Sequence, residues 1–536
     1  MRRLSPSYVF AAVLLVVLAA VALGSVPKVV TQAPTAVTGT VVPVTAATLV
    51  CPGLAASPGV SQHTVLSAGS PAPVSAPTAT PTATATPTAT ATPTATATPT
   101  ATATPTATAT PTATAVPDVL RIDRLGTSLD KVPLAAVAAS GARTVSYAVP
   151  PGPARTFVVR ATGSLAQGLS AQFLTRTPLG PARSLAAGLC AAPGGEFWFV
   201  GGGAAAGRST SLMLTNVDSA PATVDVTAYG AKGAVNAEPG QGVLVAPGKQ
   251  VALPIDSLIP GEPATAIHVV ARSGRFSASM YDTQATGLTP GGADWVPQSV
   301  SPATSVVVPA IAGDLGAART VSLVVPGPTN AVVRIGIATA NGLLVPTGYD
   351  ALEVPAGRRV SLKLSAVANP GPIGLVITSD QPLVAGVRVV RGTKAQLPDF
   401  AYAAGSAPVT APMVLTAVAT NVTTLATLQL TAGTGGDASV LVTIIPVVGA
   451  RVASVVTVPA NRTVVVQLGP GLTASAPGTV ELSPMGNTMP VYAGVTVKEL
   501  GLRGPLITTR WFSATPSSVR LPSVQPDPGL ATTTGG

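Results

Sequence analysis

The sequence has few charged side chains, 9% of 536 residues, and few aromatic side chains, 3%. It is rich in Gly and Pro, with 54 of each, and this composition excludes a coiled coil and most helical bundles because both residues interrupt helices. Apolar residues reach 47% and form short runs of Val, Ala and Leu between Gly, Pro, Ser and Thr, which is typical of strands and turns. We therefore expect an all-β chain, and its length predicts several domains.

The sequence also lacks clusters of basic residues. The formal net charge is +10, but Lys and Arg are scattered singly, without the basic patches and aromatic platforms that bind nucleic acid. We therefore predict no nucleic-acid partner. A diffuse positive charge instead favours weak attraction to an anionic surface such as a membrane or a cell-wall polymer.

Residues 1–27 predict export. Arg2 and Arg3 precede an uncharged apolar stretch from Tyr8 to Leu23, which is the pattern of a signal peptide and is short for a bilayer about 30 Å thick. Two interpretations stay open: a cleaved signal peptide, or an uncleaved hydrophobic helix that anchors the chain with its positive end inside, which we favour. The body is then extracytoplasmic, either anchored in the cell membrane or secreted.

Only two cysteines occur, Cys51 and Cys190. An isolated pair in an exported chain usually forms a disulfide, so we predict this bridge, with two buried free thiols as the alternative. Closing so long a loop stabilises a fold by about 4 to 5 kcal/mol in the chain-entropy model. The two histidines, His63 and His268, are far apart in the sequence, so no metal-ligand spacing exists and no metal or cofactor is predicted.

A six-residue repeat of Pro, Thr and Ala occupies residues 76–117. Its prolines recur at every sixth position from Pro81 to Pro111. The segment offers nothing large to bury, so we predict a disordered, extended stretch, either O-glycosylated or a bare linker. Residues 28–75 before it are predicted to be a spacer that could hold a first strand around Cys51.

Three stretches after Cys190 repeat one another at intervals of 104 to 111 residues. Each contains an apolar strand, an alternating strand, a turn and a closing hairpin. Gly248, Gly357 and Asn461 occupy one turn position, and these residue types tolerate the positive φ that tight turns require. The agreement indicates a repeated module. The predicted modules 2 to 4 span 195–300, 301–405 and 406–505, followed by a strand and tail at 506–536.

Each module has about seven short alternating strands with Gly/Pro turns, which predicts tandem immunoglobulin-like antiparallel β-sandwiches, arranged like beads on a rod. A split module 1 is predicted at 118–194, where only the back half of a module is found. Its missing strand lies at Ala47–Cys51 in one hypothesis. The Pro/Thr/Ala repeats are then an insertion within module 1.

Convergent catalytic residues are not apparent. His63 is predicted in a loop before the repeats and His268 on a strand, as a packed or edge residue. Ser128 and Lys131 match the S-x-x-K motif of penicillin-recognising enzymes, but its companion motifs are missing. Five acids near aromatic or loop signals form no recognisable glycosidase pair: Glu196, Asp218, Asp225, Asp294 and Asp399. We therefore predict no catalytic residue.

The three tryptophans, Trp198, Trp295 and Trp511, have two interpretations. They pack the junctions between modules, or they stack on sugar rings of a ligand. Exposed indole rings favour a carbohydrate-binding protein, and buried rings count against it.

The stretch Glu196–Gly203, followed by Ser211–Asn216 and Pro221–Val226, resembles the actinobacterial domain-of-unknown-function family 5719. Members are exported proteins with an N-terminal hydrophobic segment, and the early Cys51-Pro52-Gly53 and the later Cys190 fit the same pattern. The resemblance implies that the protein is exported and that it shares the lineage of this family. It implies no catalytic residue, because the family has no established activity.

These observations predict a non-enzymatic, exported cell-envelope protein that serves as a structural or binding scaffold. The expected partners are a cell-wall polymer or an envelope membrane protein, and the N-terminal segment is expected to contact the membrane. Two alternatives remain: a carbohydrate-binding accessory to envelope glycosyltransferases, and a hydrolase that acts on the cell wall.

Overall fold

More than half of the described residues of the computed structural model form β-strands. These residues are 40–54, 62–72, 116–138, 142–313, 317–364, 371–392, 396–469, 472–473, 476–486 and 488–521. The predicted hydrophobic segment at 1–27 and the Pro/Thr/Ala repeats up to residue 115 lie outside them. Within the described ranges, no helix has the length and apolar character needed to cross a membrane.

The chain divides into two units. The smaller one comprises Met1–Val42 and Ser518–Gly536, and the larger one comprises Pro43–Ser517. At the smaller unit, β1 (Thr40–Pro43) pairs with β36 (Ser518–Leu521) in a two-stranded sheet. All other described strands belong to the larger unit.

The larger unit contains four successive groups of strands, which we call modules 1 to 4. Module 1 comprises β2 (Ala46–Leu54), β3 (His63–Gly69), β4 (Val119–Arg124), β5 (Ala135–Ala138), β6 (Thr144–Val149), β7 (Arg155–Thr162), β8 (Ser170–Thr177) and β9 (Ser184–Leu189). Module 2 comprises β10 (Glu196–Val200), β11 (Arg208–Thr215), β12 (Ala222–Gly230), β13 (Gly233–Val235), β14 (Val243–Val245), β15 (Gln250–Pro254), β16 (Ala266–Ser273), β17 (Ser277–Thr286), β18 (Thr289–Val296) and β19 (Gln298–Ser299).

The remaining strands repeat this succession. Module 3 comprises β20 (Ala303–Ile311), β21 (Ala318–Val324), β22 (Ala331–Thr339), β23 (Gly342–Leu344), β24 (Leu352–Val354), β25 (Arg359–Lys363), β26 (Ile373–Arg391) and β27 (Asp399–Ala404). Module 4 comprises β28 (Met413–Val418), β29 (Thr424–Ala432), β30 (Ala438–Ile445), β31 (Val452–Val458), β32 (Thr463–Gln467), β33 (Gly478–Pro484), β34 (Val491–Gly501) and β35 (Gly504–Trp511).

All four modules have the same antiparallel strand order. In module 4 one sheet has the order β28–β33–β30–β31 and the other β32–β29–β34–β35, and module 1 repeats this as β2–β7–β4–β5 and β6–β3–β8–β9. The all-β prediction is confirmed. The strand order differs from that of an immunoglobulin domain, which keeps its first two strands in one sheet, whereas here they lie in opposite sheets.

The predicted closing hairpin is also wrong. Its two strands, β16 and β17 in module 2, belong to different sheets. In module 3 they are one continuous strand, β26, whose first part pairs with β20 and β22 and whose second part pairs with β21 and β27. Periodic apolar residues show that a strand exists, but they do not show which sheet it joins.

Each module encloses one apolar core to which both sheets contribute. In module 1 the core combines Leu120 and Phe157 of one sheet with Leu66 and Phe173 of the other, and all four are at most 1% exposed. Modules 2, 3 and 4 have equivalent cores. Alternating apolar residues form these cores because successive side chains of a strand point to opposite faces.

The Pro/Thr/Ala repeats interrupt module 1 between β3 and β4. Strand β2 pairs with β7, and β3 pairs with β6 and β8, so two strands that precede the repeats complete sheets formed after them. His63 was predicted to lie in a loop, and this prediction is wrong. His63 is the first residue of β3 and pairs with Arg176. A single histidine among Ser and Pro gives little sequence signal for a strand. Whether it belongs to a strand depends on pairing with residues that are distant in the sequence.

The predicted disulfide is present. Cys51 of β2 is bonded to Cys190, which follows β9, across 139 residues of sequence. Val50 and Ala191 exchange two backbone hydrogen bonds of 2.9 Å beside it. The bridge therefore ties one sheet of module 1 to the last strand of the other.

The equivalent turns have the predicted backbone conformation. Gly248, Gly357 and Asn461 have φ values of 66°, 67° and 60°. This left-handed region costs a residue with a Cβ atom about 1 kcal/mol or more, and Asn tolerates it better than most. The recurrence of these residue types at one repeat position is thus explained by the turn.

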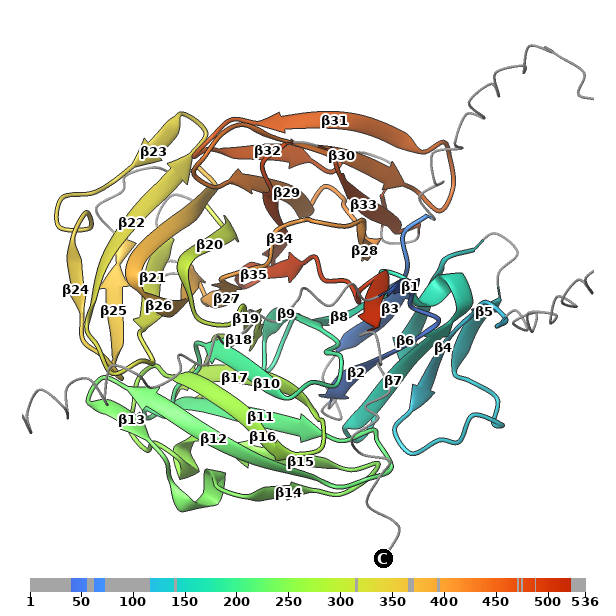
Figure 1. The fold of residues 1–536 in the computed structure, drawn as a ribbon, viewed down its shortest axis with the longest axis horizontal. Helices are drawn as coiled ribbons and strands as arrows, with labels where there is room; N and C mark the ends of the chain where they lie inside the picture. Colours follow the sequence, from blue (N-terminus) through green and yellow to red (C-terminus); the bar gives the residue numbers. More distant parts are fainter. Residues whose placement is uncertain are drawn as a thin grey trace, which may run out of the picture. The chain divides into compact units, whose positions relative to one another are not determined.

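The last strands of the four modules, β9, β18, β27 and β35, pack against one another in a closed cycle (Figure 1). Trp295, Phe400 and Trp511 lie on three of these strands, β18, β27 and β35. The modules are therefore not beads on a rod, because their last strands share one central junction.

Replacing Gly357 with Ala should lower the free energy of unfolding by about 1 kcal/mol, since the added Cβ meets open space and only the positive φ opposes it. Asn461→Gly should leave stability unchanged or raise it slightly. Gly327→Ala is the matched control, because that glycine also faces open space but lacks a positive φ. Urea unfolding measures all three, and an equal effect of both alanine variants would contradict this account.

Removing the disulfide with the double variant Cys51→Ser/Cys190→Ser should lower the free energy of unfolding by about 2 to 5 kcal/mol, because the unfolded chain regains the entropy of a long open loop. Chemical denaturation measures the change. The wild-type chain under reducing conditions should match the variant, and a loss below about 1 kcal/mol in both would refute this role of the bridge.

Candidate functional site

Two buried carboxyl groups lie at the central junction, where they had not been expected to meet. Asp294 on β18 is 1% exposed. One of its oxygens accepts hydrogen bonds from the Ala187 amide at 3.1 Å and the Thr508 hydroxyl at 3.0 Å, and the other accepts from the Tyr402 amide at 3.2 Å. These donors lie on β9, β35 and β27. One side chain therefore links the last strands of all four modules.

Asp399, the first residue of β27, makes a second such link. It is fully buried, and its Oδ2 accepts hydrogen bonds from the amides of Leu185 at 3.1 Å and Ile507 at 2.9 Å. These amides belong to β9 and β35. Three modules thus share the Asp399 carboxyl group.

Burial controls the protonation of both groups. Desolvation raises the pKa of Asp399 to about 8, although three backbone amide hydrogen bonds oppose the shift. Desolvation also raises the pKa of Asp294 well above its usual range, and the neighbouring Asp399 adds to the effect. The junction therefore favours a neutral carboxyl group at position 399 at neutral pH.

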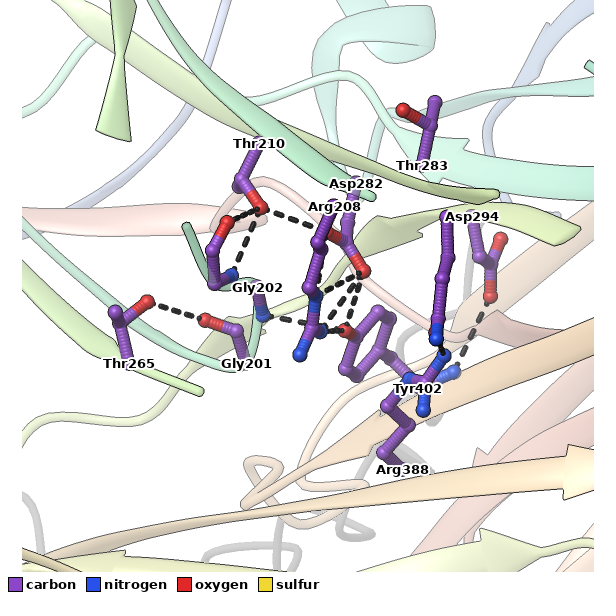
Figure 2. Close-up of polar contacts among 12 residues, drawn as sticks. Gly201, Gly202, Arg208, Thr210, Thr265, Asp282, Thr283, Asp294, Arg388 and Tyr402 are labelled. Carbon is purple, nitrogen blue, oxygen red and sulfur yellow. Dashed lines mark hydrogen bonds and ion pairs between the residues drawn. The ribbon is translucent and has the colours of Figure 1, made fainter. Parts of the chain in front are cut away.

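A second buried network joins modules 2 and 3 (Figure 2). The Asp282 carboxylate, fully buried on β17, receives the Arg208 guanidinium through Nε at 3.0 Å and Nη2 at 2.9 Å. The Tyr402 hydroxyl of module 3 donates to it at 2.7 Å, and the Thr210 hydroxyl lies 2.6 Å from its other oxygen. The ion pair is bidentate and fully hydrogen-bonded, which is the condition under which a buried pair is tolerated.

The glycine run Gly201–Gly203 makes room for this network. A Cβ atom at Gly201 would lie 2.7 Å from the Tyr402 ring, and one at Gly202 would lie 2.7 Å from the Thr210 side chain. The Gly202 amide also donates to the Tyr402 hydroxyl at 3.2 Å. The run lies between β10 and β11, and its lack of side chains lets module 3 approach module 2.

Buried arginines of modules 1 and 4 also form hydrogen bonds to other modules. Arg510 on β35 is buried, and it donates to the Gln172 side chain at 3.1 Å and to the Ala417 carbonyl at 2.8 Å, which joins module 4 to module 1. Arg183, 1% exposed, donates to the Pro505 carbonyl at 3.1 Å and to the Pro398 carbonyl at 3.4 Å. Charged residues that are scattered in sequence thus hold the modules together.

The hairpin loops between the last two strands of each module surround one pocket of about 350 Å³, which we call the four-hairpin pocket. All four modules contribute to its lining, which consists of Leu179, Gly180, Pro181, Arg183, Leu288, Thr289, Pro290, Leu397 and Arg503. The lining contains two arginines and no acid. The Arg503 side chain is exposed and has no hydrogen-bond or ion-pair partner within the described residues.

Two highly exposed leucines lie at this pocket: Leu288 lines it, and Leu502 precedes the lining residue Arg503. Leu288 and Leu502 lie at the tips of the β17–β18 and β34–β35 hairpins, and their exposed fractions are 99% and 101%. Two-residue hairpin turns favour Asn, Asp and Gly, so leucine at these tips is not explained by turn chemistry. Exposed leucines beside an unpaired guanidinium are suited to contact with a ligand.

A second cavity of about 300 Å³ lies beside the disulfide. Its wall includes Cys190, Phe199, Trp295 and Trp511, and apolar atoms predominate. No basic residue lines it. Its wall includes one acid, Glu196, so it offers no positive charge to an anionic ligand.

The three predicted tryptophans are all buried. Trp198, Trp295 and Trp511 are 3%, 6% and 7% exposed. Trp295 packs edge-on against Phe173 of module 1 at 5.1 Å, and Trp198 stacks on His268 at 3.9 Å. None presents an open ring face to a sugar, so their burial counts against the carbohydrate-binding alternative.

The other predicted acids have structural partners. Glu196 accepts hydrogen bonds from Trp198 at 2.9 Å and pairs with His268 at 2.8 Å. Its bond to Trp198 is the main cause that lowers the pKa of Glu196, whereas burial lowers the pKa of His268. Asp218 and Asp225 form surface ion pairs with Arg275 and Arg272.

Ser128 and Lys131 lie in the β4–β5 connection, where Ser128 accepts a hydrogen bond from the Lys131 amide. No group of three or more potential metal ligands occurs among the described residues. Sequence reasoning missed the Arg208–Asp282–Tyr402 network and the four-hairpin pocket. Their residues are up to 194 and 324 positions apart, and only the Gly201–Gly203 run gave a local signal.

The comparison with protein families identifies the class of protein. A family of unknown function, DUF5719, matches residues 145–469, which is more than half of the chain. The chain belongs to this family, as the resemblance indicated. No curated protein matches it.

The Asp399→Asn variant tests the central junction. The folded-state pKa of Asp399, about 8, exceeds the ordinary value of 3.8. Its contribution to stability is therefore fully present below pH 4 and is lost as the pH rises through about 8. The wild-type chain should lose stability between pH 5 and pH 9, and Asp399→Asn should reduce that loss.

Thermal unfolding at several pH values measures this dependence. Asp350→Asn is the control, because Asp350 is an exposed carboxylate away from the junction, and it should follow the wild-type profile. An Asp399→Asn profile identical to that of the wild type would contradict the burial of a neutral carboxyl group.

Proposed function

We propose that this chain is a non-enzymatic, exported cell-envelope protein whose tandem β-sandwich modules form a binding scaffold. The observation that carries the proposal is the four-hairpin pocket, to which all four modules contribute and in which the unpaired Arg503 of module 4 lies beside exposed leucines. The ligand class that fits is an anionic polymer of the cell wall, which matches the net charge of +10. The disulfide supports an extracytoplasmic location.

The junctions also support a scaffold. The buried carboxyl groups of Asp282, Asp294 and Asp399 are hydrogen-bonded to other strands and line neither of the two cavities described above. Buried groups with perturbed pKa values often mark catalytic sites, but structural networks shift pKa values in the same way. Here the two groups with raised pKa values, Asp294 and Asp399, hold strands together and line neither cavity.

The N-terminal segment has a place in this proposal. We propose that residues 1–27 anchor the scaffold in the cell membrane, so that the pocket meets wall polymer outside the cell. In the sequence, the Pro/Thr/Ala repeats lie between β3 and β4 of module 1. An accessory role beside an envelope membrane protein is the second candidate, favoured by the exposed leucines at Leu288 and Leu502.

The full chain in mild detergent, applied to immobilised peptidoglycan, arabinogalactan-type polymer and solubilised envelope proteins, tests the proposal. Saturable polymer binding is expected. Arg503→Gln should weaken it about tenfold, because a hydrogen bond to a charged group contributes about 1.5 to 3 kcal/mol. Arg334→Gln, at another exposed arginine without a partner among the described residues, should bind like the wild type.

Two results would decide against a polymer scaffold. Absence of polymer binding with capture of one membrane protein would make the chain an accessory subunit. Equal losses in Arg503→Gln and Arg334→Gln would show that binding depends on diffuse charge and not on the pocket.

A further inference from the structure

Module 4 has an exposed strand edge. Strand β31 pairs with β30 over its full length, from Val452 opposite Ile444 to Val458 opposite Ala438. No other described strand pairs with β31. Its far side therefore presents backbone N–H and C=O groups to which a further strand can bind.

The other three modules shorten or break the equivalent edge. Module 1 has only β5, of four residues. Module 2 divides the edge into β13 and β14, and module 3 into β23 and β24, each of three residues. Proteins use such interruptions to prevent strands from pairing between molecules. Only in module 4 is the edge a continuous strand of seven residues.

Strand β31 also lacks the residues that usually protect an edge. Between Val452 and Val458 there is no charged residue, Pro or Gly. Val452 and Val455 are 61% and 56% exposed, and Val447 and Val448 in the preceding loop are 70% and 77% exposed. A continuous, uncharged, valine-rich edge is a strong template for strand addition.

We propose that this edge pairs with the same edge of a second copy of the chain. Two β31 strands would run antiparallel about a two-fold axis, and full overlap would place that axis at Val455. The first sheets of two module 4 copies would then form one continuous sheet. Such an interface is isologous, which means that both copies use the same strand. If one residue contacts a second residue of the other copy, that second residue contacts the first in return.

The charges at the ends of β31 favour a second copy over an unrelated peptide. Arg451 precedes the strand, is exposed and has no ion-pair partner in the described chain. Beyond the other end, the Asp437 carboxylate accepts the Ala460 amide at 2.9 Å and forms no ion pair with a described residue. Antiparallel overlap places Arg451 of each copy opposite Pro459 of the other, next to Ala460 and Asp437.

Sedimentation velocity of the full chain in density-matched detergent tests the proposal. The wild-type chain should dimerise at micromolar concentrations. Val455→Lys should weaken dimerisation at least tenfold, because the two-fold axis would place two lysines directly opposite each other. Val332→Lys is the matched control, since Val332 is a strand valine in module 3 with a similar exposed fraction of 52%, and it should dimerise normally.

A mixing experiment tests the two-fold axis itself. Val455→Lys and Val455→Glu should each be monomeric, and an equimolar mixture should form a dimer, because lysine then lies opposite glutamate. Thermal unfolding should show that each variant is folded. Val452→Lys, at the start of the strand, is a second disrupting variant in case Val455→Lys is unstable.

Three results would overturn the proposal: a monomeric wild-type chain, a Val455→Lys variant that dimerises like the wild type, or a mixture that stays monomeric. Because polymer binding depends on Arg503 in the four-hairpin pocket, a failed dimer would leave the proposed function intact. Conversely, loss of polymer binding would leave the dimer unaffected.

Discussion

The constraint on which the larger unit depends is the contact among the last strands of its four modules. A carboxyl group buried at such a place must be hydrogen-bonded, because an unpaired buried polar group is costly. Asp294 meets this requirement only when β9, β27 and β35 all stand beside β18. The position of each module is therefore tied to the other three, and the hairpin loops at the ends of these strands are brought to one place.

The contacts between modules explain where many of the few charged residues, 9% of the chain, are placed. Several of its charged side chains lie at contacts between modules, such as Arg208 with Asp282 and Tyr402, where each donor has an acceptor. Arg359 and Glu262 form a further ion pair between modules 3 and 2 at 3.0 Å. Apolar cores form the individual modules, and buried polar networks determine how the modules meet. Arg503, in contrast, lies at the surface and has no partner among the described residues. The pocket that it lines is therefore the candidate binding site.

Much of the repeated unit was predictable from local sequence. The turn positions at Gly248, Gly357 and Asn461 recur because backbone sterics restrict positive φ to a few residue types. The disulfide was predictable because the chain offers only one pairing. The alternation of apolar and polar residues located most strands, but it did not show the order of the strands within the sheets. The closing hairpin was wrong and the strand order differs from that of an immunoglobulin domain, since strands that are neighbours in the sequence often lie in different sheets here.

The candidate site was beyond sequence reasoning. Asp294 and Asp399 were recognised as acids near aromatic residues, yet their meeting depends on strands from different modules, 105 residues apart in this pair and further apart for their donors. By itself the sequence determined the strands, the turns, the repeat and the family, because each rests on short-range sterics, side-chain alternation or residue identity. Only the tertiary structure decided the central junction, the four-hairpin pocket and the open edge of β31, because these depend on which sheets the strands join and how the modules pack.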